Sequence, residues 1–399
     1  MMMKFSAVSP YNAASRLKLP DKVVIYDSTL RDGEQMPGVH FTMAQKVAIA
    51  RKLAEVGVPQ IEAGFPAVSE QEKETIKAIV GLGLSSEILC LARTTQSDID
   101  AAAECDVDMV LLFIATSDIH MRYKLKMTKE EVVRRAVMSV EYAHARGLKA
   151  SLSTEDSTRS DVLFLKEMYK ACEAAGASRL GITDTLGCAG PEAISFLVRK
   201  MRDATTLPLS AHLHNDFGLG LVNSLAALDN GAEAIATTVG GIGERAGNVS
   251  LEQFAMALKH IYKRDIGIKT EELTDLNRMV FEAAGLPMPA NQPWVGPNAF
   301  SHESGIHVSA VLNCPMTYEC VDPEEVGNRR RLVLGKHSGT ALVKSRLQER
   351  SVNASQEQIC DIVRAIKKAG EEHGRVSEDE FWKIVDGVLA RPEKNPDCA

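Results

Sequence analysis

Eight stretches rich in β-branched and aliphatic residues, each followed by a helical pattern, fill the chain between residues 23 and 263. Strands that alternate with helices predict a parallel sheet. Eight such units in roughly 250 residues are typical of a closed (β/α)8 barrel, the TIM barrel. The predicted strands are residues 23–25, 59–64, 87–93, 108–116, 148–154, 178–184, 207–216 and 232–239.

The alternative fold is an open doubly wound sheet. That sheet would need a glycine-rich phosphate loop of the form G-x-G-x-x-G after an early strand. The chain has no such motif there, and its segment GGIGERAG, at residues 240–247, follows the eighth strand instead. The fold class that we predict is therefore α/β, a TIM barrel followed by a small C-terminal helical subdomain.

The alternation stops after residue 263. Residues 271–285 have the pattern of one more helix, and residues 355–390 that of two amphipathic helices. Between them, residues 287–313 are rich in Pro, Gly and Asn and too long for a simple connection, so we interpret them as a functional loop. We expect an N-terminal arm (1–21), a catalytic barrel (22–280), a linker subdomain with a histidine loop (281–349) and a helical subdomain (350–399).

Composition excludes several classes of protein. With 45% hydrophobic residues in 399, the chain can bury one large core and a smaller unit. A net charge of −7 argues against nucleic acid as a partner. No apolar run approaches the roughly 20 residues that cross a bilayer, so no membrane partner is expected. The eight cysteines form no C-x-x-C pair and are expected to be free thiols in a reducing cytoplasm.

Polar side chains gather where the predicted strands end. The first strand runs into YDSTLRDGEQ, which holds Arg31, Asp32 and Gln35. The active site of a TIM barrel lies at the C-terminal ends of its strands, so these positions are candidates for catalysis. Polar residues in or directly after later strands include Glu62, Arg93, Glu155, Asp156, Arg159, Asp184, Thr185, His212, His214, Glu244, Arg245 and Asn248.

The pair His212 and His214 gives the sharpest chemical signal. A spacing of two on a strand puts both rings on one face. Together with Asp32 they predict a site for a divalent metal with positions open to substrate, whereas the alternative is two hydrogen-bonded histidines. Such a site suits a 2-oxo acid, whose carboxylate and ketone can chelate a metal ion. Arg31 could pair with the substrate carboxylate, and Glu155 with a histidine of the long loop could transfer protons.

Five motifs carry a family resemblance. The segments DSTLRDGEQ, HLHND, GGIGERAGN, FSHESGIH and LVLGKHSG, within residues 22–350, resemble the homocitrate synthase, 2-isopropylmalate synthase and citramalate synthase family. The resemblance implies a metal-dependent TIM-barrel acyltransferase. Such an enzyme joins acetyl-CoA to a 2-oxo acid in a Claisen-type condensation and then hydrolyses the thioester. The R-D-G-E-Q turn alone would also fit acyl-CoA lyases and carboxyltransferases.

The resemblance also implies roles for individual residues. The metal, with Zn, Mn and Mg left open, would be bound by Asp32, His212, His214 and Asn248. Arg31 would hold the 2-oxo acid, with Gln35 and Thr185 close by, and Glu155 matches the conserved acid of the family. His302, His307 and Tyr318 match a region that reaches the active site from the other subunit of a homodimer. Either His302 or His307 could be the proton-transfer residue.

The choice of 2-oxo acid depends on weaker features. The segment SDIH at residues 117–120 and the absence of a further regulatory domain favour a homocitrate synthase that uses 2-oxoglutarate. The segment EILCLAR at residues 87–93 looks like an isopropylmalate synthase, and there Arg93 could pair with a distal carboxylate. The alternatives are 2-oxoisovalerate, pyruvate, or a lyase on the same barrel. A catalytically inactive binding barrel is disfavoured by the full set of polar residues.

Overall fold

The computed structural model describes residues 7–14 and 17–391, which divide into two compact units. The first unit comprises Pro10–Met288, and the second consists of residues 289–391 with residues 7–9. Of the predicted arm, residues 1–6 and 15–16 lie outside the described residues, as do residues 392–399 of the predicted C-terminal subdomain. In the described part of the chain, no helix combines the length and hydrophobicity that crossing a bilayer requires, and all seven cysteines there are free thiols.

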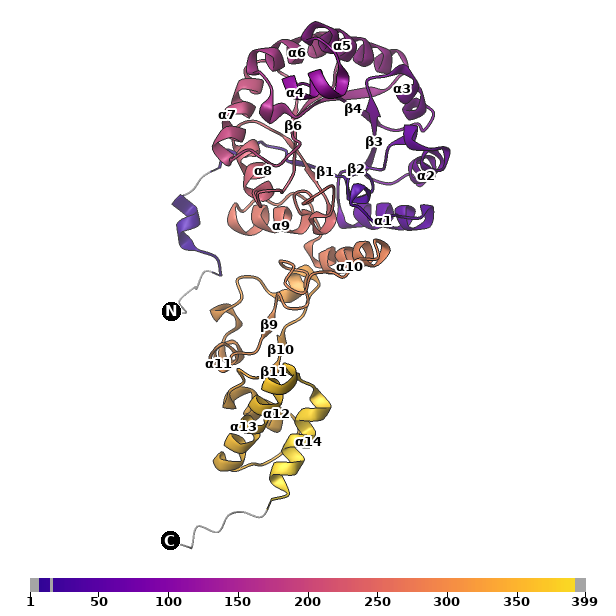
Figure 1. The fold of residues 1–399 in the computed structure, drawn as a ribbon. Helices are drawn as coiled ribbons and strands as arrows, with labels where there is room; N and C mark the ends of the chain where they lie inside the picture. Colours follow the sequence, from indigo (N-terminus) through magenta and orange to yellow (C-terminus); the bar gives the residue numbers. More distant parts are fainter. Residues whose placement is uncertain (1–6, 15–16, 392–399) are drawn as a thin grey trace. The chain divides into compact units, whose positions relative to one another are not determined.

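The first unit is a closed barrel of eight parallel strands in sequence order, which confirms the predicted TIM barrel (Figure 1). Its strands are β1 (Val24–Asp27), β2 (Gln60–Glu62), β3 (Glu87–Arg93), β4 (Met109–Ala115), β5 (Lys149–Glu155), β6 (Arg179–Asp184), β7 (Leu209–Leu213) and β8 (Ala234–Thr237). The ring closes where β8 pairs with β1, with Ala234 opposite Val24 and Thr237 opposite Asp27. The first and last strands are therefore neighbours.

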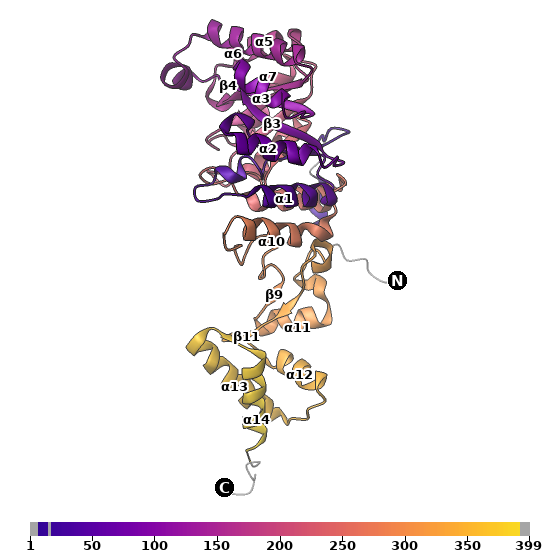
Figure 2. The same ribbon diagram turned by 90° about the vertical axis from the view of Figure 1, so that its right-hand side faces the viewer.

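Helices surround the strands, as Figures 1 and 2 show. They are α1 (Met43–Val56), α2 (Glu70–Val80), α3 (Gln96–Ala103), α5 (Lys129–Ala145), α6 (Val162–Ala174), α7 (Pro191–Arg202), α8 (Gly220–Asp229) and α9 (Leu251–Met256), followed by α10 (Leu273–Ala283). Helix α1 begins at the N-cap Thr42, which forms a capping box with Gln45. It ends at Gly57, whose φ of 98° is left-handed.

Short irregular elements follow several strands and form part of the C-terminal end of the barrel. They are η2 (Gly33–Gln35), η3 (Pro66–Val68), α4 (Asp118–His120), the π-helical turn η4 (Met121–Leu125), η5 (Ser157–Arg159) and η6 (Val239–Gly241). Strand β7 ends at Leu213, three residues before the predicted end at residue 216. The chain leaves the ladder there because His214 pairs in an isolated antiparallel bridge with Asn248.

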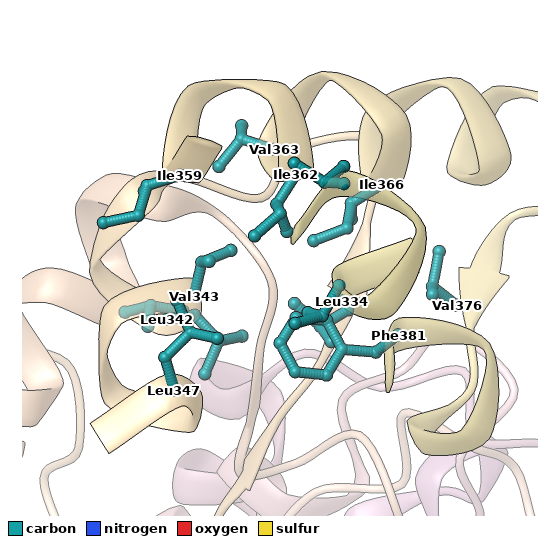
Figure 3. Close-up of a cluster of buried hydrophobic side chains, with 13 residues drawn as sticks. Leu334, Leu342, Val343, Leu347, Ile359, Ile362, Val363, Ile366, Val376 and Phe381 are labelled. Carbon is teal, nitrogen blue, oxygen red and sulfur yellow. The ribbon is translucent and has the colours of Figure 1, made fainter. Parts of the chain in front are cut away.

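The second unit has its own hydrophobic core (Figure 3). It contains β9 (Ser301–His302) paired with β10 (Arg331–Leu332), β11 (Leu334–Gly335) paired with β12 (Arg375–Val376), α11 (Gly305–Asn313), α12 (Thr340–Glu349), α13 (Gln356–His373) and α14 (Glu378–Leu389). Phe381, Ile362 and Ile366 are buried in this core with Leu342 and Val308. The two predicted amphipathic helices are α13 and α14, and Figure 2 shows α12 near them.

The predicted loop at residues 287–313 is only partly irregular. Its last nine residues form α11, because Val308 and Val311 share a helical face and are buried. At the start of this helix, Gly305 lies against the backbone of Gly339. A side-chain carbon on Gly305 would overlap that backbone, so glycine is needed there. The core of the second unit includes residues on both sides of residue 350, and the predicted subdomain boundaries stay predictions.

Candidate active site

A cavity of about 460 Å³ opens at the C-terminal ends of the barrel strands. Its walls include Tyr26, Leu91, Leu111 and Phe113, which are apolar or aromatic, and a larger set of polar side chains. The predicted site residues that line it are Arg31, Asp32, Gln35, Glu155, Thr185, His212 and His214. The cavity therefore collects side chains from β1, β5, β6 and β7, as the barrel topology predicts.

Asp32, His212 and His214 form a compact cluster in this cavity. One potential ligand atom from each of the three lies within 4.8 Å of those from the other two. His212 Nε2 lies 3.4 Å from Asp32 Oδ2, and His214 Nε2 lies 4.0 Å from the same oxygen. The two Nε2 atoms are 3.1 Å apart. The spacing of two thus brings the imidazoles together although His214 lies just beyond the end of β7.

Asn248 completes this cluster from the segment after β8. Its Nδ2 donates a hydrogen bond of 2.9 Å to Asp32 Oδ1, while its Oδ1 is buried and has no partner among the described residues. Gly243 has a φ of 155°, and a side-chain carbon there would overlap the Asn248 amide. Glycine at this position therefore allows the segment to close onto Asp32.

The four residues fit a divalent cation. Burial raises the pKa of Asp32, but Arg31 and the two histidines outweigh it and hold this pKa well below its usual range. Burial, with a contribution from His212, lowers the pKa of His214 to about 4. A carboxylate and an uncharged imidazole are the forms that bind metal ions. The free amide oxygen of Asn248 is a further oxygen donor.

Arg31 is held in place by Glu62, one of the polar residues at the strand ends, for which the sequence indicated no individual role. Arg31 Nε and Nη2 donate to Glu62 at 2.7 and 3.0 Å, and Nη1 donates to Asp32 at 2.6 Å and to Gln35 at 3.1 Å. Glu62 is fully buried and also accepts from the Ser28 hydroxyl. The sequence did contain a signal for this pair, since Glu62 is a single acid within an apolar strand. A charge is buried only where it has a partner, so a cationic partner could have been expected.

Glu155 lies at the end of β5, beside Lys124 and His120 from the segment after β4. Lys124 Nζ lies 2.6 and 2.7 Å from the two carboxylate oxygens of Glu155. His120 Nδ1 lies 3.6 Å from Glu155 Oε1. Neither Lys124 nor His120 was predicted as a site residue, although SDIH was singled out. Thr185 faces the same region, and its Oγ1 accepts from the Asp156 N–H at 2.9 Å.

The structure does not place Arg93 in the cavity. Its Nε donates to Asp98 Oδ2 at 2.8 Å, and its side chain is 57% exposed. Its guanidinium carbon lies 5.7 Å from the Phe65 ring centroid. Arg93 is not among the described residues that line the cavity. In this state its charge is engaged by a local partner in α3.

His302, His307 and Tyr318 belong to the second unit, where they form two separate arrangements. His302 Nε2 lies 3.0 Å from Oε1 of Glu319, a buried carboxylate. The His307 ring stacks on Tyr318 with centroids 3.9 Å apart and an interplanar angle of 26°. His307 is exposed and Tyr318 is 45% exposed, so both rings are available to solvent or a partner.

Comparison with known proteins identifies relatives along the whole chain. Residues 22–280 match the HMGL-like family model, and residues 294–374 match the model described as homocitrate synthase post-HMGL domain-like. The chain is 50% identical to homocitrate synthase AksA of Methanopyrus kandleri, over 96% of both chains. It is 51% identical to a probable 2-isopropylmalate synthase of the same organism, over 88% of this chain and 71% of that one.

A solved structure agrees with the barrel. The HMG-CoA lyase of Bacillus subtilis superposes with a TM-score of 0.61 at 21% identity, covering 68% of this chain and 96% of the lyase. At that identity the likeness shows the fold alone.

Proposed function

The chain belongs to the HMGL-like family, and on that premise we propose that it is an acyltransferase that condenses acetyl-CoA with 2-oxoglutarate and hydrolyses the thioester to give homocitrate. The observation that carries this proposal is the cluster of Asp32, His212 and His214 at the barrel mouth. It occurs in a chain with 50% identity to a homocitrate synthase over nearly its whole length.

In this proposal Asp32, His212, His214 and Asn248 hold a divalent metal ion, Zn, Mn or Mg. When bound, the ion supplies a Lewis acid for the ketone of the 2-oxo acid. Asp32 lies between the Asn248 amide and the Arg31 guanidinium, which fix its carboxylate in place. Leu91 and Leu111 contribute apolar walls to the same cavity.

Arg31 orients the acceptor with Gln35 and Thr185. Four of the five N–H groups that a guanidinium offers are already engaged, by Glu62, Asp32 and Gln35. One Nη2 hydrogen is left for a substrate carboxylate. Arg93 stays a proposed partner for the distal carboxylate, and this role requires its pair with Asp98 to open. Lys124 already lines the cavity and is a second candidate.

Glu155 acts as the acid or base inside the barrel, positioned by Lys124. We assign the second proton-transfer role to His307, with Tyr318, because these two rings are exposed and stacked. His302 is engaged by Glu319 instead. In our proposal His307 and Tyr318 enter the site of a second copy, so the enzyme is a homodimer with composite active sites.

Exposed apolar side chains support this assembly. Around His307 and Tyr318 the second unit exposes Ile306, Leu312 and Met316. The segments after β4 and β7 expose Ile119, Tyr123 and Phe217 at the barrel mouth. Apolar groups exposed in this way favour a protein partner. An obligate interface of this kind would bury more than about 2,000 Å².

The function is tested by measuring release of CoA thiol from acetyl-CoA with 2-oxoglutarate, 2-oxoisovalerate and pyruvate as acceptors. We expect the highest kcat/KM for 2-oxoglutarate. A higher value for 2-oxoisovalerate would make the chain a 2-isopropylmalate synthase, the second candidate, which the 51% identical relative and the segment EILCLAR favour. Absence of thiol release with every acceptor would refute the condensation.

A further inference from the structure

A buried carboxylate in the second unit, Glu319, is bound by two side chains that flank it in the sequence, 17 residues before it and 11 residues after it. Arg330 donates to Glu319 through Nε at 2.8 Å and Nη2 at 2.6 Å, and His302 Nε2 lies 3.0 Å from Glu319 Oε1. The Glu319 side chain is only 3% exposed. Two parallel N–H contacts from arginine fix both the distance and the plane of the carboxylate. We call these three residues the Glu319 network.

The network connects the two segments that carry the stacked rings. His302 lies on β9, three residues before α11 starts at Gly305, and His307 lies in the first turn of that helix. Glu319 directly follows Tyr318, and both residues donate their backbone N–H to the Pro315 carbonyl at 3.0–3.1 Å. A displacement of Glu319 would therefore displace Tyr318 relative to His307.

The pairing of β9 with β10 also holds His302 and the segment of Arg330 together. Arg330 immediately precedes β10, whose Leu332 pairs with His302 of β9. Arg331, the residue after the donor, gives its backbone N–H to the Phe300 carbonyl, and the His302 carbonyl accepts the Val333 N–H, both at 2.9 Å. Burial opposes ionisation of Glu319, but the contacts with Arg330 and His302 lower its pKa below the ordinary value. The carboxylate is therefore charged at neutral pH.

Stability alone is a weak reason for such an arrangement. Replacing a buried ion pair with well-packed apolar residues is often neutral or stabilising. A buried charge network that adds little stability can still fix one geometry among several. Here the geometry that it fixes is that of the segments flanking an exposed, stacked pair of rings.

We propose that Glu319, through Arg330 and His302, is a positioning residue that sets the His307–Tyr318 pair for proton transfer. This inference rests on the proposed function, in which that pair enters an active site. It also gives His302 a role as part of the Glu319 network, distinct from the proton transfer assigned to His307.

The test is the isosteric substitution Glu319→Gln, assayed in the full-length protein by acetyl-CoA thiol release. We expect kcat to fall by about 10- to 100-fold, because small misplacement of a catalytic group has effects of that size. The KM values for acetyl-CoA and the 2-oxo acid should not change, since Glu319 touches neither. A general loss of structure would instead change KM and the thermal unfolding midpoint together.

The chain offers a matched control. His373 and Glu380 form a second His–Glu pair in the same unit, with Nε2 and Oε2 also 3.0 Å apart, but between α13 and α14. We expect Glu380→Gln to keep the kcat of the wild type. An equal loss of kcat in both variants would overturn the positioning role, because the effect would then be general to the unit.

The outcomes separate this inference from the proposed function. If the wild type releases no thiol with any 2-oxo acid, the proposed function fails. If the wild type is active and Glu319→Gln keeps full kcat, only the positioning inference fails. Should Glu319→Gln not fold, Arg330→Gln, at a side chain 31% exposed, is expected to show the same selective loss of kcat. If both variants unfold, the network is structural support and the inference is overturned.

Discussion

Asp27, at the end of β1, is a buried carboxylate with few donors. Its Oδ1 accepts the Thr29 N–H at 3.0 Å and its Oδ2 accepts the Thr237 hydroxyl at 3.3 Å. Burial raises its pKa to about 7, against 3.8 for an exposed aspartate, because these bonds do not replace the lost hydration. We predict that Asp27→Asn stabilises the barrel at neutral and alkaline pH.

The magnitude follows from the pKa shift. A rise in the pKa of Asp27 from 3.8 to about 7 corresponds to a difference of about 4 kcal/mol, as an upper limit, between the two protonation states. Between pH 3.8 and 7 the folded state holds a proton on Asp27 that the unfolded state has lost. The free energy of unfolding of the wild type therefore falls as the pH rises through this window. Asparagine removes this dependence, since its amide cannot ionise.

The assay is chemical unfolding of the wild type and Asp27→Asn at pH 4, 6 and 8. The two proteins should have equal free energies of unfolding near pH 4 and differ by up to about 4 kcal/mol at pH 8. Asp184 is the matched control, because it is equally buried but accepts from the Thr158 hydroxyl and from the Cys188 and Ala189 N–H groups. Asp184→Asn should destabilise, since its NH₂ would face a donor. A difference for Asp27→Asn that does not grow with pH would refute the reasoning.

Three further predictions concern catalysis. Chelation should abolish activity, and Zn²⁺, Mn²⁺ or Mg²⁺ should restore it. A divalent ion should also raise the unfolding temperature of the wild type but not that of His212→Ala. Full activity of the metal-free protein would contradict the metal site. Glu155→Gln should bind the 2-oxo acid but lose about 10²–10⁴-fold in turnover, and near-normal turnover would remove Glu155 from the mechanism. The third prediction uses two inactive variants, Asp32→Ala and the double variant His302→Ala with His307→Ala. When they are mixed and their subunits exchange at random, activity should return towards a quarter of that of the wild type. If mass spectrometry detects subunit exchange but no activity returns, shared sites are excluded.

The fold was predictable because each strand is a compact aliphatic run. A strand of this kind can be recognised from its local sequence alone, and eight such strands alternating with helices are typical of a TIM barrel. The cluster of Asp32, His212 and His214 was predictable for a related reason. His212 and His214 are spaced for one face of a strand, and the closed ring brings the last strands beside Asp32. Sequence could therefore place three side chains from residues far apart in the chain.

Other parts of the site depend on contacts that the local pattern does not encode. Arg93 was placed at the right strand end, but Asp98 in the first turn of α3 binds its guanidinium outside the cavity. Lys124 lies on the π-helical turn η4, which has no repeating apolar pattern to reveal it. Helix α11 was missed because only Val308 and Val311 mark its buried face.

The pairing of β8 with β1 has a consequence for biosynthesis. Asp32 and Asn248 meet across this seam although 216 residues separate them in the chain. A growing polypeptide therefore lacks one side of this contact until Asn248 has been made. Contacts of such long range form late, because the entropy of closing the intervening chain must first be overcome. An ion that needs both sides of the seam would bind only after the ring has closed, and its binding would then slow the reopening of the ring.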